Sequence, residues 1–179
     1  MPEPKRILLI SGSTRDGSAN TAALRTVAET APAWVTAVLY GGLSGLPAFN
    51  ADHDGADLPP AAARLRREIA DADAVMFCTP EYAGTLPGSL KNLLDWTVGG
   101  GELFGKPVAW INVASEGRGG GAQATLETVL SYVGARVVEQ ACRRLPVARD
   151  WVSTNGVITD PVFRAEVADA AAQLGSSGA

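Results

Sequence analysis

The chain has 179 residues, a length that suits a single domain. Hydrophobic residues make up 46% and charged residues 19%, an ordinary globular composition that excludes intrinsic disorder and needs no disulfide or structural metal. The balance of 15 basic against 19 acidic residues gives a formal net charge of −4, so we expect neither nucleic acid nor a membrane surface as a partner.

Five apolar, partly β-branched segments are predicted to be strands. In chain order they are residues 6–11, 34–39, 74–79, 108–114 and 135–138. Helical periodicity follows each of them, over residues 20–31, 60–71, 87–96, 122–132 and from 160 onward. Because strands alternate with helices, the chain is predicted to form an α/β, doubly wound parallel sheet with helices on both faces.

Two segments are predicted to lack regular structure. The longest, residues 40–58, is rich in glycine and acidic residues and is expected to be a flexible surface loop. The chain ends in Gly-Ser-Ser-Gly-Ala, so we expect residues 170–179 to be a frayed tail. No linker or repeat divides the sequence, and we therefore predict one domain over residues 1–179.

Cysteine and histidine usage points away from metal chemistry. Cys78 and Cys142 lie far apart and form no C-x-x-C pair, so both are expected to be buried small hydrophobes. His53 lies between two aspartates, but this spacing fits neither an EF-hand nor a zinc site, and we expect no metal. Only four consecutive aliphatic residues follow the amino terminus, too few for a signal peptide, and we expect a cytoplasmic protein.

The loop after the first predicted strand has the composition of a phosphate site. Its glycines allow backbone N–H groups to approach an anion, and the following helix start adds a favourable dipole. Hydroxyls of Ser13, Ser18 and Thr21 can donate, and Arg15 offers a charge-assisted fork. The spacing fits neither a Walker loop nor G-x-G-x-x-G. A capped helix start with a solvated arginine is the alternative interpretation.

Two further loops lie at the same predicted edge, where parallel sheets bind ligands. Residues 79–88 contain two prolines and two glycines, which fix a turn that can aim backbone groups at a flat heterocycle beside Tyr82. Residues 115–121 hold four glycines, a density typical of close backbone approach to a ligand. The alternatives are an ordinary strand-to-helix connection and a loose surface loop.

The motifs G-S-T-R-x-G-S-x-N, T-P-E-Y-x-G-T-x-P-G-x-L-K-N-x-L-D-W and S-x-G-x-x-G-G at these loops resemble the NADPH-dependent FMN reductase family. The resemblance covers about residues 5–138. It implies a flavodoxin-like, five-stranded parallel sheet in the order 2-1-3-4-5. It also implies FMN as the cofactor, NADPH or NADH as the electron donor, and a homodimer or homotetramer.

By position, the resemblance implies binding residues in all three loops. The FMN phosphate is assigned to Ser13, Arg15, Ser18, Asn20 and Thr21. The isoalloxazine and ribityl region is assigned to Pro80, Glu81, Tyr82, Ala83, Gly84 and Thr85. The other ring edge, near the nicotinamide approach, is assigned to Ser115, Gly117, Arg118, Gly119 and Gly120. Ala83 departs from the family's usual Asn, so any hydrogen bond from that amide is missing.

The implied activity is an oxidoreductase that moves hydride from NAD(P)H through FMN to an acceptor by a ping-pong mechanism. Acceptors of this family include quinones, azo compounds, metal oxyanions and free flavin. A partner that supplies free reduced flavin to a monooxygenase competes with direct quinone or azo reduction, and the loops are compatible with both. No catalytic side chain is expected, because the cofactor carries the chemistry. Two alternatives remain: a flavodoxin-type electron carrier without its own NAD(P)H turnover, and an interaction protein that no longer binds FMN.

Overall fold

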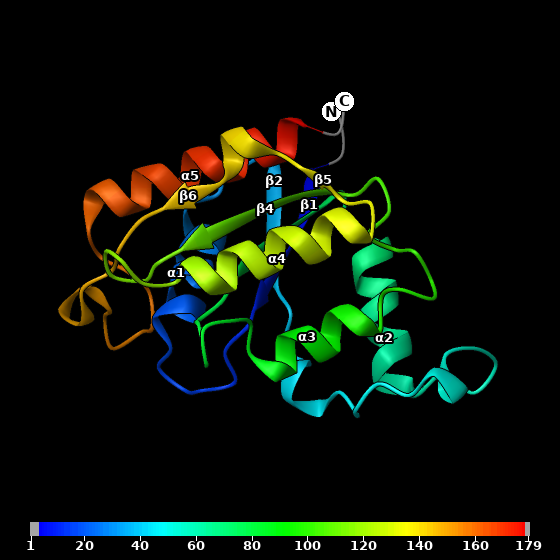
Figure 1. Ribbon diagram of the computed structural model, residues 1–179. Coiled ribbons are helices and arrows are strands. Elements are labelled where there is room, and N and C mark those ends of the chain that lie inside the picture. Colours follow the sequence, from blue (N-terminus) through cyan, green and yellow to red (C-terminus); the bar gives the residue numbers. More distant parts are fainter. Residues whose placement is uncertain (1–3, 178–179) are drawn as a thin grey trace.

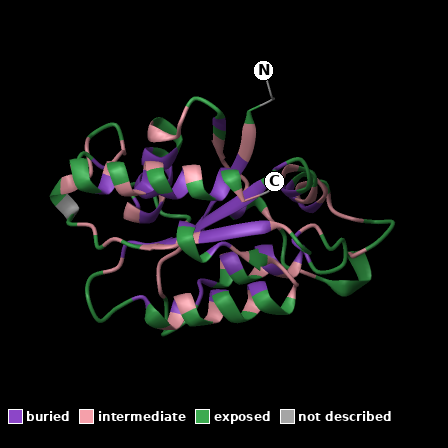
Figure 2. Cartoon of the chain, turned by 90° about the horizontal axis from the view of Figure 1, so that it is seen from above, coloured by how far each residue is buried: buried purple, intermediate pink, exposed green. Residues whose placement is uncertain are grey.

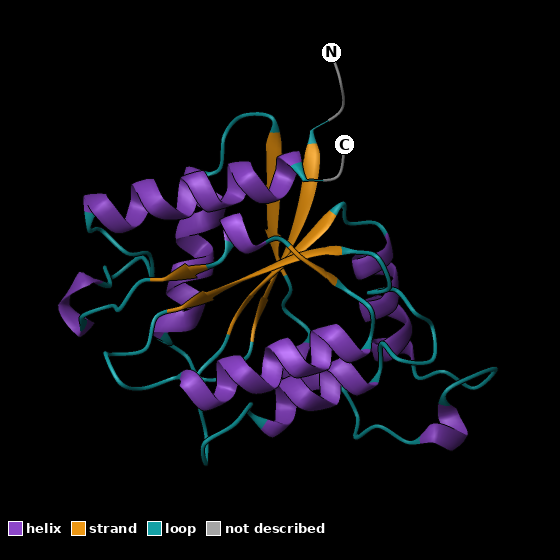
Figure 3. Cartoon of the chain, turned by 45° about the horizontal axis from the view of Figure 1, so that its top comes forward, coloured by secondary structure: helices purple, strands orange, loops and turns teal. Residues whose placement is uncertain are grey.

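A parallel sheet lies between two layers of helices in the computed structural model, which describes residues 4–177 (Figures 1 and 3). Its main strands are β1 (Lys5–Ser11), β2 (Val35–Leu39), β3 (Ala74–Cys78), β4 (Pro107–Asn112) and β5 (Arg136–Val137). They are parallel and run in the order β2-β1-β3-β4-β5. The predicted flavodoxin-like, doubly wound architecture and its strand order are therefore confirmed.

Five helices cover the two faces of this sheet. They are α1 (Ala19–Thr30), α2 (Pro60–Ala70), α3 (Gly88–Asp95), α4 (Gly120–Tyr132) and α5 (Pro161–Ser176). The first and last pack on one face, and the other three pack on the opposite face. No helix within residues 4–177 is long and apolar enough to cross a membrane.

The central strands are apolar on both sides because each side faces a helix layer. Along β1, Ile7 and Leu9 face α1 and α5, whereas Leu8 and Ile10 face the other helices. All four side chains are fully buried. Figure 2 shows the same pattern, with buried residues along the sheet and on the inner sides of the helices.

A short sixth strand, β6 (Arg143–Arg144), was not predicted. It pairs in parallel with the end of β4 at Ile111 and Asn112, whereas β5 pairs only with the start of β4. Its two arginines give no apolar signal that sequence reasoning could detect. The strand is held by long-range contacts instead, because Arg143 forms ion pairs with Glu166 (3.0 Å) and with Asp169 of α5.

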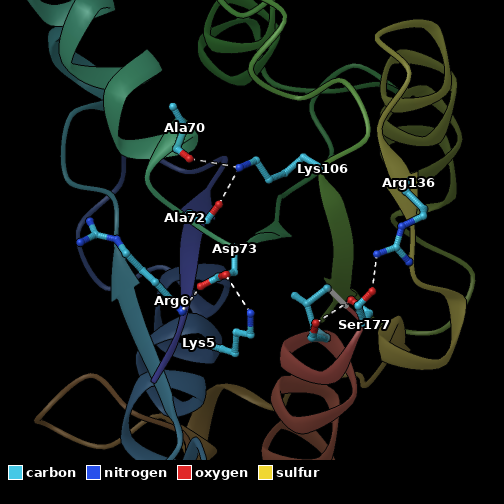
Figure 4. Close-up of polar contacts among 9 residues, drawn as sticks. Lys5, Arg6, Ala70, Ala72, Asp73, Lys106, Arg136 and Ser177 are labelled. Atoms are coloured by element: carbon cyan, nitrogen blue, oxygen red, sulfur yellow. Dashed lines mark hydrogen bonds and ion pairs between the residues drawn. The ribbon is translucent and has the colours of Figure 1, made fainter. Parts of the chain in front are cut away.

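The expected frayed tail from residue 170 is wrong for the residues that the structure describes. Helix α5 continues to Ser176, and Ala170 and Leu174 are buried in the core. Gly175 packs so tightly that a Cβ there would lie 2.9 Å from the ring of Trp34. The guanidinium of Arg136 also donates to the carbonyl of Ser177 (Figure 4). Residues 178–179 lie outside the described residues.

The segment of residues 40–58 is anchored, contrary to the expected flexible loop. The ring of Phe49 packs edge-on against Trp96 with a centroid distance of 5.0 Å. The indole of Trp96 donates to the carbonyl of Pro47 (2.9 Å), and Asn92 accepts from the Phe49 amide (2.7 Å). Local sequence composition could not predict these bonds, because each joins residues more than 40 positions apart. Asn92 lies on α3, and Trp96 lies just after it.

Charged groups hold the amino end of the sheet, away from the loops with the binding motifs (Figure 4). The carboxylate of Asp73 accepts from the Arg6 amide (2.8 Å) and from Lys5 Nζ (3.2 Å). The hydrogen bond from Arg6 is the largest cause that lowers the pKa of Asp73. Lys106 donates to the carbonyl of Ala72 (2.6 Å), and its partial burial lowers its own pKa. These contacts hold the amino ends of the strands together and lie away from the candidate site.

Candidate functional site

Three loops, those after β1, β3 and β4, meet at the carboxyl edge of the sheet, at the left of Figure 1. Glycines make their close approach possible. A Cβ on Gly12 would lie 2.1 Å from Oγ1 of Thr79, and a Cβ on Gly121 would lie 2.0 Å from the carbonyl oxygen of Gly84. The predicted convergence of the three motif-bearing loops is therefore present, and two glycines are needed for contact between loops.

The loop after β3 is joined to the start of α4 through Glu81. Its carboxylate accepts from the backbone N–H groups of Gly121 (2.7 Å) and Ala122 (3.1 Å). The N-cap of α4 is Gly119, which has no side chain to bond these groups. Glu81 supplies that cap and places a negative charge at the positive end of the helix. Its carboxylate therefore orders protein structure, which leaves its backbone for ligand contact.

Residues 82–85 form a two-residue hairpin turn. Tyr82 and Thr85 exchange backbone hydrogen bonds of 3.0 and 3.1 Å. Ala83 and Gly84 have φ values of +49° and +77°, the left-handed conformation at both central positions that Asn-Gly favours. Ala83 is the only non-glycine residue with positive φ among residues 4–177. Alanine at position 83, where the family usually has Asn, therefore costs about 1 kcal/mol of backbone strain. It also lacks the side-chain amide that could form a hydrogen bond.

The turn is also tied to α4 by its last residue. Oγ1 of Thr85 lies 2.8 Å from Oγ1 of Thr125, whose hydroxyl donates to the carbonyl of Gly121 (2.8 Å). Tyr82 is 54% exposed at the first position of the turn. The arrangement presents an aromatic side chain and an ordered stretch of backbone to a ligand.

The glycine loop after β4 is exposed from Ser115 to Arg118. Two residues that sequence reasoning missed shape it. Asn112, at the buried end of β4, donates to the carbonyl of Gly119 (3.2 Å) and accepts from the Ala114 amide (3.0 Å). Arg144 of β6 donates to the carbonyl of Arg118 (2.6 Å). The sequence could have indicated Asn112, because it is a polar residue near the end of an otherwise apolar predicted strand. No sequence pattern indicates a role for Arg144.

A cavity of about 350 Å³ lies between the loop after β1, the first turns of α1 and the end of β2. Three of the predicted phosphate residues line it: Ser13, Arg15 and Thr21. Arg25 and Ser44 also line it and were not predicted. Arg25 follows Thr21 by four residues on α1, so helical periodicity was the signal that could have found it.

The other two predicted phosphate residues do not line this cavity. Ser18 is the N-cap of α1 and accepts from the Asn20 amide (3.2 Å). The side-chain oxygen of Asn20 accepts from the thiol of Cys78 (3.4 Å). Burial raises the pKa of that thiol, so Cys78 stays protonated and serves as a donor. Both predicted residues are buried. Ser18 caps α1, and Asn20 bonds the start of α1 to β3.

The cavity has the donors that a phosphate group needs. No ion pair engages Arg15 or Arg25 within residues 4–177, and Arg15 makes only a long contact (3.5 Å) to the carbonyl of Gly17. The described residues also provide no acceptor for the backbone N–H groups of Asp16 and Gly17. Free N–H groups, hydroxyls and two guanidinium groups together suit an anion. Among residues 4–177, no three or more His, Cys, Asp or Glu side chains come together in a group that could hold a metal ion.

Comparisons with known proteins agree with this geometry. The sequence model of the NADPH-dependent FMN reductase family matches residues 5–148. An NAD(P)H-dependent FMN reductase of Pseudomonas aeruginosa is 41% identical over 126 residues, or 69% of this chain and 67% of that protein. A quinone reductase of Escherichia coli is 34% identical over 145 residues, or 78% of this chain and 77% of that protein.

The fold comparison gives the same result. The solved structure of a flavoenzyme NAD(P)H:(acceptor) oxidoreductase from Paracoccus denitrificans has a TM-score of 0.76 and 28% sequence identity. The match covers 96% of this chain and 98% of that one. Sequence and fold therefore resemble the same group of proteins.

Proposed function

The chain belongs to the NADPH-dependent FMN reductase family, and from this premise we propose that it moves hydride from NAD(P)H through bound FMN to a small acceptor of the quinone type. The observation that carries the proposal is the meeting of three motif-bearing loops at one edge of the sheet. Bound FMN supplies the redox chemistry, so the protein contributes binding and orientation. The names of the relatives do not favour an electron carrier without its own turnover.

The loop after β1 would hold the phosphate of FMN. Ser13 and Thr21 supply hydroxyls, and Arg15 supplies a cation beside the cavity. Backbone N–H groups of this loop add neutral donors, and the start of α1 adds its dipole. Ser18 and Asn20 fix that helix start through side-chain oxygens that accept hydrogen bonds within the protein, and the O–H of Ser18 remains a donor for the phosphate.

The loops after β3 and β4 would hold the flavin ring. Residues 80–85 provide backbone groups for the ring's polar edge, with Tyr82 as an apolar wall. Residues 115–120 border the other side, where Arg118 is an exposed cation for the incoming pyridine nucleotide. Glu81 and Thr85 keep the two loops at a fixed separation through their bonds to α4. Because FMN supplies the redox chemistry, the acceptor is selected by how it fits against the ring.

We also propose that the protein acts as a homodimer or homotetramer in the cytoplasm, where NAD(P)H is available. Phe104 and Tyr132 are 79% and 87% exposed, and with Val98 they line a hollow of about 280 Å³ beside the carboxyl end of α4. An exposed aromatic patch of this kind suits contact with a second subunit. Light scattering during size-exclusion chromatography measures the mass, and a monomer with full activity contradicts the assembly.

The test of the proposed function is an absorbance scan of the purified protein after incubation with FMN and desalting. Anaerobic titration with NADPH and with NADH follows. Retained flavin that either donor bleaches, and that quinone reoxidises, is the expected result, and the titration shows which donor is preferred. Retained flavin that neither donor bleaches supports an electron carrier instead. Protein that retains no flavin contradicts the proposal.

A further inference from the structure

Arg25 lies outside every motif that located the site, yet it lines the cavity at the loop after β1. It follows Thr21 by one helical turn on α1, so both side chains lie on the same face of the helix. Arg15 comes from the loop itself. Two guanidinium groups from different elements therefore border one cavity.

The position of the Arg25 side chain is constrained by a neighbouring loop. A Cβ on Gly156 would lie only 2.6 Å from Nη1 of Arg25, so the guanidinium packs close to the backbone of that glycine. The loop itself is fixed, because the Ile158 amide donates to Oγ1 of Thr26 on α1 (2.8 Å). Ile158 also forms an isolated bridge with Val152. Arg25 is thus held between the cavity and an anchored loop.

The charge around Arg25 is unbalanced. Other arginines of the described chain, such as Arg66, Arg143 and Arg164, form ion pairs with acidic side chains. Within residues 4–177 neither Arg15 nor Arg25 has such a partner. Asp16 is the acidic residue of the cavity lining. Two cations against one anion leave a net positive cavity, which suits a phosphate dianion.

We propose that Arg25 is a second phosphate-binding residue and that, with Arg15, it makes the protein select FMN over riboflavin, which lacks the phosphate. This inference rests on the proposed function, since it takes FMN as the ligand. Arg25 would add charge from the second turn of α1, whereas Ser13 and Arg15 would contribute from the loop after β1. Its contribution acts on the phosphate alone, because no residue of the loops after β3 and β4 lines this cavity.

The experiment measures the dissociation constants of FMN and riboflavin by quenching of flavin fluorescence on apoprotein. Arg25→Gln is expected to weaken FMN about 10- to 100-fold, the range for loss of a charged hydrogen bond. Riboflavin affinity should stay within about twofold, because its binding involves no phosphate. Arg25→Lys should recover part of the loss, and higher salt should weaken FMN binding less in Arg25→Gln than in the wild type.

Arg67→Gln is the matched control, because Arg67 is exposed on α2 at the opposite face of the sheet. It should change neither constant, and circular dichroism shows that each variant is folded. FMN affinity within twofold of wild type in Arg25→Gln overturns the inference, as does an equal loss for both flavins. So does wild-type protein that binds the two flavins equally. If NAD(P)H fails to bleach bound FMN, the proposed function is contradicted. The role of Arg25 is still tested in that case, because the FMN and riboflavin dissociation constants do not depend on turnover.

Discussion

The two ends of the candidate site are built differently. At the ring end, the loops after β3 and β4 are bonded to each other through Glu81 and through Thr85 with Thr125. At the phosphate end, the loop after β1 borders a cavity with two guanidinium groups that have no acidic partner in the described chain. Protein bonds thus order the first end in advance. The second end keeps its two guanidinium groups and the N–H groups of Asp16 and Gly17 for a ligand, while Oγ1 of Thr21 lies 2.8 Å from Oγ of Ser11. Mutations should therefore separate the two ends.

The largest effect is expected where the ring-end loops touch. Gly121→Ala places a Cβ 2.0 Å from the backbone oxygen of Gly84, so one loop must move. We expect a loss of about 3 kcal/mol in the free energy of unfolding, together with loss of both FMN and riboflavin binding. For the stability change, Gly120→Ala is the matched control, because nothing lies within 4 Å of its Cβ position. Urea unfolding measures both, and equal stability of the two variants contradicts the close contact.

Glu81→Gln should have the next largest effect. The amide keeps one oxygen acceptor but loses the charge that complements the start of α4. We expect a loss of about 1 kcal/mol in stability, and FMN and riboflavin affinities that fall by the same factor. Urea unfolding and flavin fluorescence provide the readings. A variant that loses FMN but keeps riboflavin shows that Glu81 acts on the phosphate end, contrary to this account.

Ala83→Asn tests the strained turn. Asn tolerates the left-handed conformation that Ala83 now adopts at φ +49°, so we expect a gain of about 0.5 to 1 kcal/mol in stability. Ala83→Gly should also gain stability, since glycine removes the steric cost. Higher FMN affinity without any gain in stability indicates instead that the Asn side chain acts through its own hydrogen bond.

The smallest effect is expected at Asp73, far from both ends of the site. The pKa of Asp73 is lowered in the folded protein. Its stabilisation is therefore fully present above the unfolded pKa of about 3.9 and is lost as pH falls through the folded pKa. Asp73→Asn should therefore flatten the acid side of the stability profile and leave flavin affinity unchanged. Thermal unfolding between about pH 2 and 5 measures this slope. An unchanged acid slope contradicts the lowered pKa of Asp73 in the folded protein.

The sequence predicted the sheet and the three loops because apolar periodicity and glycine motifs are local signals. It could not show that Glu81 bonds to α4, because the partners are 40 residues apart. Strand β6 and the anchoring of Phe49 on Trp96 also depend on contacts between residues far apart in the sequence. Arg25 could have been predicted, because it follows Thr21 by one helical turn. It was missed because the motif that carries the resemblance ends before Arg25.

The most direct test of the division between the two ends is the ratio of riboflavin to FMN dissociation constants. We expect wild-type protein to bind FMN at least about tenfold more tightly. Arg15→Gln should lower that ratio towards one, and Glu81→Gln should leave it unchanged while both constants rise. A wild-type ratio near one, or a ratio that Arg15→Gln does not change, contradicts a phosphate site at the loop after β1.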